Sequence, residues 1–119
     1  MLIAVAHGSR NPAWRASVEQ QFEALQADMG AESIRLAYME LSPPTLLDVV
    51  REAVQHGTKR IRILPLFLAA DGHVDRDIRP VVDQIREAFD SVDIELLAPL
   101  GQQPLFRELL RTIATEETQ

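Results

Sequence analysis

Two histidines stand directly after apolar segments that are far apart in the sequence. His7 follows the run Leu2–Ala6, and His73 comes shortly after a second run that ends near Leu68. A neutral imidazole can bind a divalent metal ion or accept a proton near pH 7. Open α/β sheets bind their ligands at the carboxyl ends of the strands. We therefore predict that both runs are strands and that His7 and His73 contribute to one site.

A carboxylate occupies a comparable position after a third segment. Glu40 follows residues 33–38, which alternate enough to form a strand with one less buried face. Two imidazoles and one carboxylate form a ligand set that suits cobalt, iron, nickel or zinc better than calcium or magnesium. The alternative for each residue is a structural role, because loop histidines often only form hydrogen bonds and surface glutamates are common.

The remaining pattern predicts four strands and four helices in alternation. The strands are expected at residues 2–6, 33–38, 60–66 and 93–97. Helices are expected from Pro12 to near Gly30, from Thr45 to His56, after the turn at residues 71–73, and after Pro99. Apolar residues three and four apart place one stripe of each helix in the core. The stripes comprise Trp14, Val18, Phe22, Leu25 and Met29; Leu46, Val49, Val50 and Ala53; Ile78, Val81, Val82, Ile85 and Phe89; and Leu105, Phe106, Leu109, Leu110 and Ile113.

This alternation predicts an α/β fold in which residues 1–119 form a single domain. Right-handed crossovers give a four-stranded parallel sheet with helices on both faces. In the flavodoxin-like strand order 2-1-3-4, the first and third strands are neighbours. His7 and His73 then flank one crevice, although they are distant in sequence.

Composition narrows the possible partners and locations. Hydrophobic residues make up 46% of the chain and charged residues 25%, which is typical of a globular protein. No cysteine is present, so disulfides and thiolate metal sites are excluded. The net charge of −6, without a basic run, argues against a nucleic-acid partner. The sequence shows neither a signal peptide nor a membrane span, which predicts no membrane partner and a cytoplasmic location.

Five short motifs occur in order along the chain. They are His7-Gly8-Ser9-Arg10, Tyr38-Met39-Glu40 before a Pro-rich helix start, Pro65-Leu66-Phe67-Leu68 followed by Gly72-His73-Val74, Asp77-Ile78, and Pro99-Leu100-Gly101. Together they resemble the small class II chelatases of tetrapyrrole biosynthesis, and in particular the short CbiX/SirB-type sirohydrochlorin chelatases. The resemblance spans nearly the whole chain. It implies a chelatase-like domain that inserts Co²⁺, Fe²⁺ or Ni²⁺ into sirohydrochlorin in cobalamin or siroheme biosynthesis, with the metal as substrate and no organic cofactor.

The resemblance also implies roles for individual residues. By position, His7 and His73 are the metal-binding and proton-accepting histidines, and Glu40 is a third metal ligand. A flat tetrapyrrole needs an apolar floor and groups that bind its carboxylates. The residues expected to bind it are Gly8, Ser9, Arg10, Leu41, Phe67, Leu68, Gly72 and Val74, with Arg76 and Arg79 as further candidates. For each arginine, a solvated surface charge is the alternative.

Two alternative functions use the same residues, and the family resemblance also suggests an oligomeric state. A tetrapyrrole or metal carrier, or a regulatory homologue without turnover, would use the same histidines. A histidine phosphatase would use His7 as its nucleophile, but that family has an arginine where this chain has Ala6. Longer members of the chelatase family resemble two such domains fused, so we expect this chain to form a homodimer.

Overall fold

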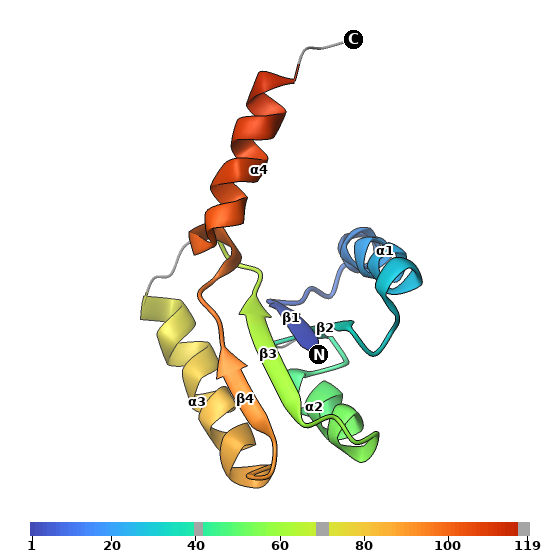
Figure 1. The fold of residues 1–119 in the computed structure, drawn as a ribbon, viewed down its shortest axis with the longest axis vertical. Coiled ribbons are helices and arrows are strands. Elements are labelled where there is room, and N and C mark those ends of the chain that lie inside the picture. The colour runs from blue at the N-terminus through green and yellow to red at the C-terminus, as the bar shows by residue number, and fades with distance from the viewer. Residues whose placement is uncertain (40–41, 69–71, 117–119) are drawn as a thin grey trace.

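The computed structural model describes residues 1–39, 42–68 and 72–116, with the side chains of residues 72–75 excepted. Four strands alternate with four α-helices, and one 3₁₀ turn precedes the last helix (Figure 1). In chain order the elements are β1 (Leu2–Ala6), α1 (Pro12–Met29), β2 (Ile34–Tyr38), α2 (Leu46–Gln55), β3 (Arg60–Pro65), α3 (Gly72–Ala88), β4 (Asp93–Leu96), η1 (Leu100–Gln102) and α4 (Pro104–Thr115). The predicted strands and helices are thus confirmed, with bounds that differ by a few residues.

The strands form one parallel sheet in the order β2-β1-β3-β4, as predicted. Strand β1 is central, and its Ala4 lies opposite Leu36 of β2 and Leu64 of β3. All four strands therefore end at the same edge of the sheet. The carboxyl ends of β1 and β3 are neighbours there, which places the segment after Ala6 beside the segment after Pro65.

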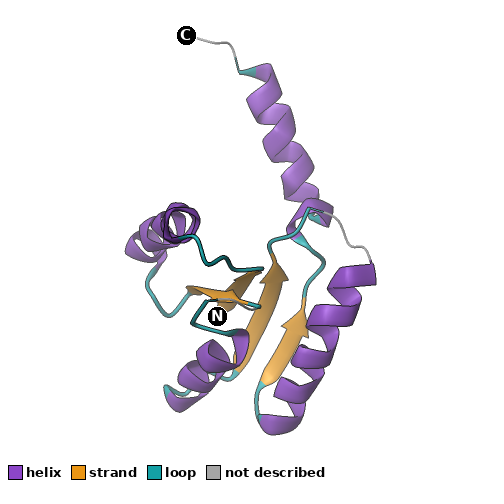
Figure 2. Cartoon of the chain, turned by 180° about the vertical axis from the view of Figure 1, so that it is seen from behind, coloured by secondary structure: helices purple, strands orange, loops and turns teal. Residues whose placement is uncertain are grey.

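Alternate residues of the strands face two different layers. One face packs against α2 and α3, and its core contains Ile3, Val5, Ala37, Ile61, Ile63 and Ile94 from the strands. The other face packs against α1 through Ala6, Leu36 and Tyr38. Figure 2 shows the sheet between these layers. The apolar stripes predicted for α2 and α3 are confirmed as core, since Val49, Val50, Ile78 and Val82 are fully buried.

The stripe of α1 is only partly buried, which corrects the prediction that it is core. Val18 and Phe22 pack against the small cluster on the sheet, whereas Trp14, Leu25 and Met29 are exposed. A single helix over two strands contacts them along a narrow line. The ends and edges of its stripe therefore remain in solvent.

The prediction that the α4 stripe points inward is wrong. Helix α4 extends away from the sheet and makes the molecule 50 Å long (Figure 1). Leu105, Leu109, Leu110 and Ile113 are between 52% and 80% exposed. The physical reason lies in the sheet face that α4 would have to cover, because there β3 and β4 present the exposed charged residues Arg60, Arg62, Asp93 and Glu95. An apolar helix packed on this face would bury those charges.

None of the helices in the described part of the chain has the length and apolar character needed to cross a membrane.

Candidate functional site

His7 lies at the carboxyl edge of the sheet, immediately after β1. Its side chain is exposed, and its ring packs against the ring of Phe67 with centroids 4.3 Å apart and planes tilted by 32°. The pairing of β1 with β3 brings the two residues together, since the Leu66 N–H donates a 2.8 Å hydrogen bond to the Val5 carbonyl. An imidazole held against an apolar ring and open to solvent can bind a metal ion or accept a proton.

The turn after His7 is fixed by hydrogen bonds to two other segments. Gly8 has a φ of 98°, which a residue with a side chain rarely adopts. The Ser9 N–H donates to the Ser42 hydroxyl at 3.3 Å, and that hydroxyl donates to the Ser9 carbonyl at 3.2 Å. The same carbonyl accepts a 3.2 Å hydrogen bond from Arg15 Nη1. The predicted site residues Gly8 and Ser9 therefore shape the backbone beside His7.

A glycine contact holds the segment that carries Phe67 and Leu68. The Gly101 N–H donates to the Phe67 carbonyl at 3.0 Å. A Cβ atom on Gly101 would lie 1.7 Å from the Leu68 carbonyl oxygen, so any larger residue would force the two segments apart. Leu68 itself is 68% exposed and directly follows Phe67, the residue that contacts His7. The motif Pro99-Leu100-Gly101 thus packs against the backbone of the segment that carries Phe67, the residue in contact with His7.

The structure places the other predicted residues only in part. Gly72 and His73 lie in the first turn of α3, while the side chains of His73 and Val74 are outside the described residues, as are Glu40 and Leu41 entirely. Arg10, Arg76 and Arg79 are exposed. Among the described side chains, no three His, Asp or Glu residues are grouped to hold a metal ion.

Behind the site, a buried tyrosine links α1 to β2. The Tyr38 hydroxyl donates a 2.7 Å hydrogen bond to Glu19 Oε1, and Tyr38 is fully buried. Burial and the neighbouring Glu19 carboxylate raise the pKa of Tyr38 to about 12. The hydroxyl therefore stays neutral as a structural donor, because both burial and the neighbouring carboxylate disfavour the phenolate.

Sequence reasoning missed the residues that support His7. Ser42 and Arg15 are not among the predicted site residues, and Gly101 is predicted only as part of a motif. Ser42 had one available signal, since serine beside two prolines after a strand is a common turn element. Its partner Ser9 is 33 residues away and was not predictable from local pattern. His56, which is not among the predicted site residues, caps α2 at the opposite edge of the sheet, where its Nδ1 lies 2.8 Å from the Glu52 carbonyl.

Comparison with known proteins adds independent evidence. The family model CbiX matches residues 1–117. A sirohydrochlorin cobaltochelatase from Methanopyrus kandleri is 36% identical over 77 residues, which cover 65% of this chain and 54% of that relative. The chloroplastic sirohydrochlorin ferrochelatase of Arabidopsis thaliana is 28% identical over 92% of this chain and 48% of its own length. The chain thus spans about half the length of these relatives.

A solved structure matches over almost its entire length. The crystal structure of a cobalamin (vitamin B12) biosynthesis CbiX protein from Marinobacter aquaeolei VT8 has a TM-score of 0.82 and 30% sequence identity, and the match covers 95% of this chain and 92% of that one. The strand order agrees with the order predicted from the sequence, and His7 of the motif His7-Gly8-Ser9-Arg10 lies directly after β1. On the evidence of its sequence and its fold, this chain belongs to the CbiX family.

Proposed function

We propose that this chain inserts a divalent metal ion, Co²⁺ or Fe²⁺ and by the same chemistry Ni²⁺, into sirohydrochlorin. His7 and His73 bind the incoming metal and accept protons, and Glu40 is a third ligand. Family membership and the names of the two chelatase relatives support this activity. The metal is a substrate, so the reaction needs a site that both binds the ion and releases it.

The observation that carries the proposal is the place of His7. Its exposed imidazole packs on Phe67 at the edge where β1 and β3 end together. The helix that carries His73 begins seven residues after β3 ends, so both histidine segments leave the same pair of neighbouring strands. This topology supports one site made of two residues that are 66 positions apart.

The chemistry of insertion fits two imidazoles at one edge. Metal insertion removes two protons from the pyrrole nitrogens while the ion moves from protein ligands to the macrocycle. A neutral imidazole can serve as ligand or as general base near pH 7, and two of them allow both tasks on one face of the ring. Phe67 and Leu68, with Leu41 and Val74, would form an apolar floor. Gly8, Ser9, Arg10 and Gly72 would contact the carboxylates at the rim.

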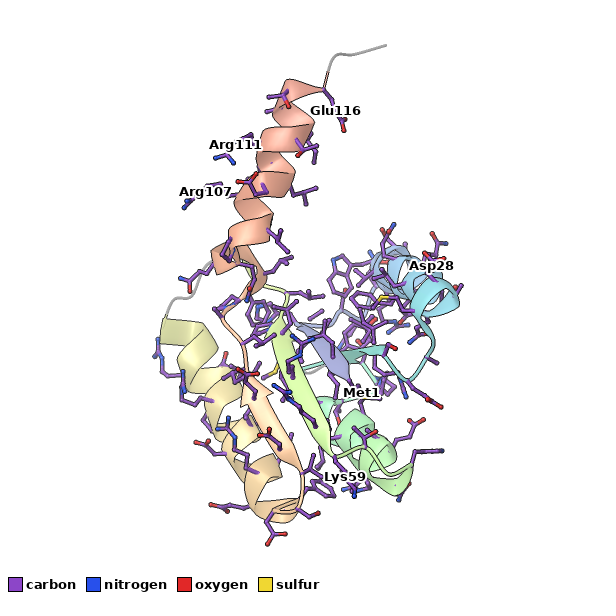
Figure 3. All side chains as sticks on the ribbon, in the orientation of Figure 1. Met1, Asp28, Lys59, Arg107, Arg111 and Glu116 are labelled. Carbon is purple, nitrogen blue, oxygen red and sulfur yellow. The ribbon has the colours of Figure 1, made fainter. Side chains whose placement is uncertain are left out.

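We also propose that two copies of the chain form a homodimer. The exposed apolar stripe of α4 supports this, because a protein of this size rarely leaves four neighbouring large apolar side chains in solvent. Arg107 and Arg111 project together from one side of α4 (Figure 3). At 100° per residue, these two positions fall on the face of the helix opposite Leu109 and Ile113, so the two charges lie outside the apolar stripe.

A turnover assay separates an enzyme from a carrier. Excess sirohydrochlorin and Co²⁺ are mixed with substoichiometric protein, and the absorption change of the macrocycle is followed against a protein-free reaction. A chelatase converts many equivalents of macrocycle faster than the background rate. A carrier perturbs at most one equivalent and leaves the background rate unchanged with Co²⁺, Fe²⁺ and Ni²⁺ alike, and that result would refute the proposal.

A further inference from the structure

We infer that Ser42 is a positioning residue for His7, an inference that rests on the proposed function. Ser42 is a buried polar residue, with only 6% of its surface exposed. Every hydrogen bond described for its hydroxyl goes to Ser9, two residues after His7. The side chain therefore acts on the turn that carries the histidine.

The geometry of this contact is that of a two-point clamp. A serine hydroxyl has one proton to donate and lone pairs to accept. Here the proton goes to the Ser9 carbonyl at 3.2 Å, and the oxygen accepts from the Ser9 N–H at 3.3 Å. Both backbone polar groups of Ser9 are thus satisfied by one atom from another segment, which fixes the position and direction of the turn.

The clamp matters because His7 has few other constraints on this side. Gly8, between His7 and Ser9, has a positive φ and no side chain to pack. The His7 ring contacts Phe67 on the side of β3, so Ser9 anchors the turn on the side of β2. Arg15 donates to the Ser9 carbonyl as well, but a guanidinium cannot accept a hydrogen bond, so the acceptor described for the Ser9 N–H is the Ser42 hydroxyl. Loss of the Ser42 hydroxyl therefore leaves the partly buried Ser9 N–H without its partner and frees the turn to move.

Ser42 is also close in sequence to a proposed metal ligand. Ser42 lies two residues after Glu40, the proposed third ligand. The Ser42 hydroxyl ties the residue that follows the proposed ligand segment after β2 to the turn after β1, so one side chain outside the proposed ligand set joins these two parts of the chain. Small misplacement of such groups is costly in catalysis, because the reacting atoms must be aligned to within a fraction of an ångström.

The test uses the Co²⁺ insertion rate of the full chain. We expect Ser42→Ala to lower kcat/KM about tenfold, in the range typical of residues that orient metal ligands. Ser42→Thr keeps the hydroxyl and is expected to stay within about twofold of the wild type. The matched control is Ser33→Ala, which removes another serine hydroxyl bonded to a backbone carbonyl, that of Met29 at 2.8 Å, at the opposite edge of the sheet. It should leave kcat/KM unchanged.

A double-mutant cycle distinguishes positioning of His7 from general support of the fold. If Ser42 acts through His7, Ser42→Ala reduces the residual rate of His7→Ala by less than about twofold. A full tenfold loss in that background, or a rate for Ser42→Ala equal to that of the wild type, would overturn the inference. An unchanged rate in His7→Ala alone would instead refute the proposed function, so the two failures are separable.

Discussion

Helices α3 and α4 carry apolar stripes of similar spacing, but only α3 is buried by its own chain. Ile78, Val82 and Ile85 of α3 are at most 2% exposed, whereas the three leucines of α4 and Ile113 are more than half exposed. Strands β3 and β4 explain the difference, because they offer isoleucines to α3 and charged residues on the face that α4 would cover. Helical spacing identifies an apolar stripe, and the opposing surface decides whether the stripe finds a partner.

The largest expected effect comes from removing a side chain of the buried stripe. Ile78→Ala should lower the free energy of unfolding by about 3 kcal/mol, because Ile78 is fully buried and the substitution leaves a cavity. Its matched control is Ile113→Ala on α4, at 55% exposure. In urea denaturation, Ile78→Ala should lower the free energy of unfolding at every protein concentration. The loss for Ile113→Ala should disappear at low protein concentration, where the proposed dimer dissociates. Equal losses at every concentration would mean that α4 packs on its own chain.

A charge in the α4 stripe should break the proposed dimer without unfolding the chain. Leu109→Asp combined with Leu110→Asp introduces two carboxylates into the apolar surface, and a buried unpaired carboxylate opposes association. We expect light scattering to give the mass of two chains for the wild type and of one chain for the variant, with circular dichroism unchanged. A wild type that is monomeric at micromolar concentration and fully active would contradict the dimer.

The apolar stripe of α1 is buried less than that of α3 and more than that of α4. One side-chain hydrogen bond, between Tyr38 and Glu19, contributes to holding α1 on β2. Tyr38→Phe removes the bond to Glu19 and should cost about 1–2 kcal/mol in urea denaturation. Because the folded pKa of Tyr38 is raised to about 12, this contribution is present below pH 10 and is lost as the pH rises from 10 toward 12. Tyr38 is the sole tyrosine in the sequence, so phenolate absorption reports it directly. Titration near pH 10 would contradict the buried hydrogen bond.

The smallest effect is expected at the start of α2, whose stripe is as well buried as that of α3. The Thr45 side chain accepts from the Asp48 N–H, and the Asp48 carboxylate accepts from the Thr45 N–H. These bonds lower the pKa of Asp48, so their contribution is present at neutral pH and is lost as the pH falls below about 4. Thr45→Ala should lower the free energy of unfolding by about 1 kcal/mol at pH 7. As the pH falls, the variant should then lose less stability than the wild type. An unchanged acid profile would exclude the capping box.

Local pattern was sufficient to predict the strands, the helices and their order. The apolar run of β1 predicted a strand at residues 2–6, and the flavodoxin-like strand order then placed β1 beside β3. The sequence also contains a signal for the exposure of the α4 stripe. Charged residues alternate with the core residues of β3 and β4, namely Arg60, Arg62, Asp93 and Glu95. That signal required comparing a helix with a strand face far from it in sequence.

The site was predictable at the level of segments and not of contacts. The sequence placed His7 at a strand end, and the structure adds its packing on Phe67. The Ser9–Ser42 clamp and the close approach of Gly101 to Leu68 join segments about 33 residues apart, so no periodicity could indicate them. The positions of Glu40 and of the His73 side chain stay predictions.

The most direct test of the account compares the three histidines of the chain in Co²⁺ insertion into sirohydrochlorin. We expect His7→Ala and His73→Ala each to lower kcat/KM by at least about 100-fold, and the double variant to lose little more, because the two act as one unit. His56→Ala, at the opposite edge of the sheet, should stay within about twofold of the wild type. Wild-type rates for His7→Ala, or losses that multiply in the double variant, would contradict a single site shared by His7 and His73.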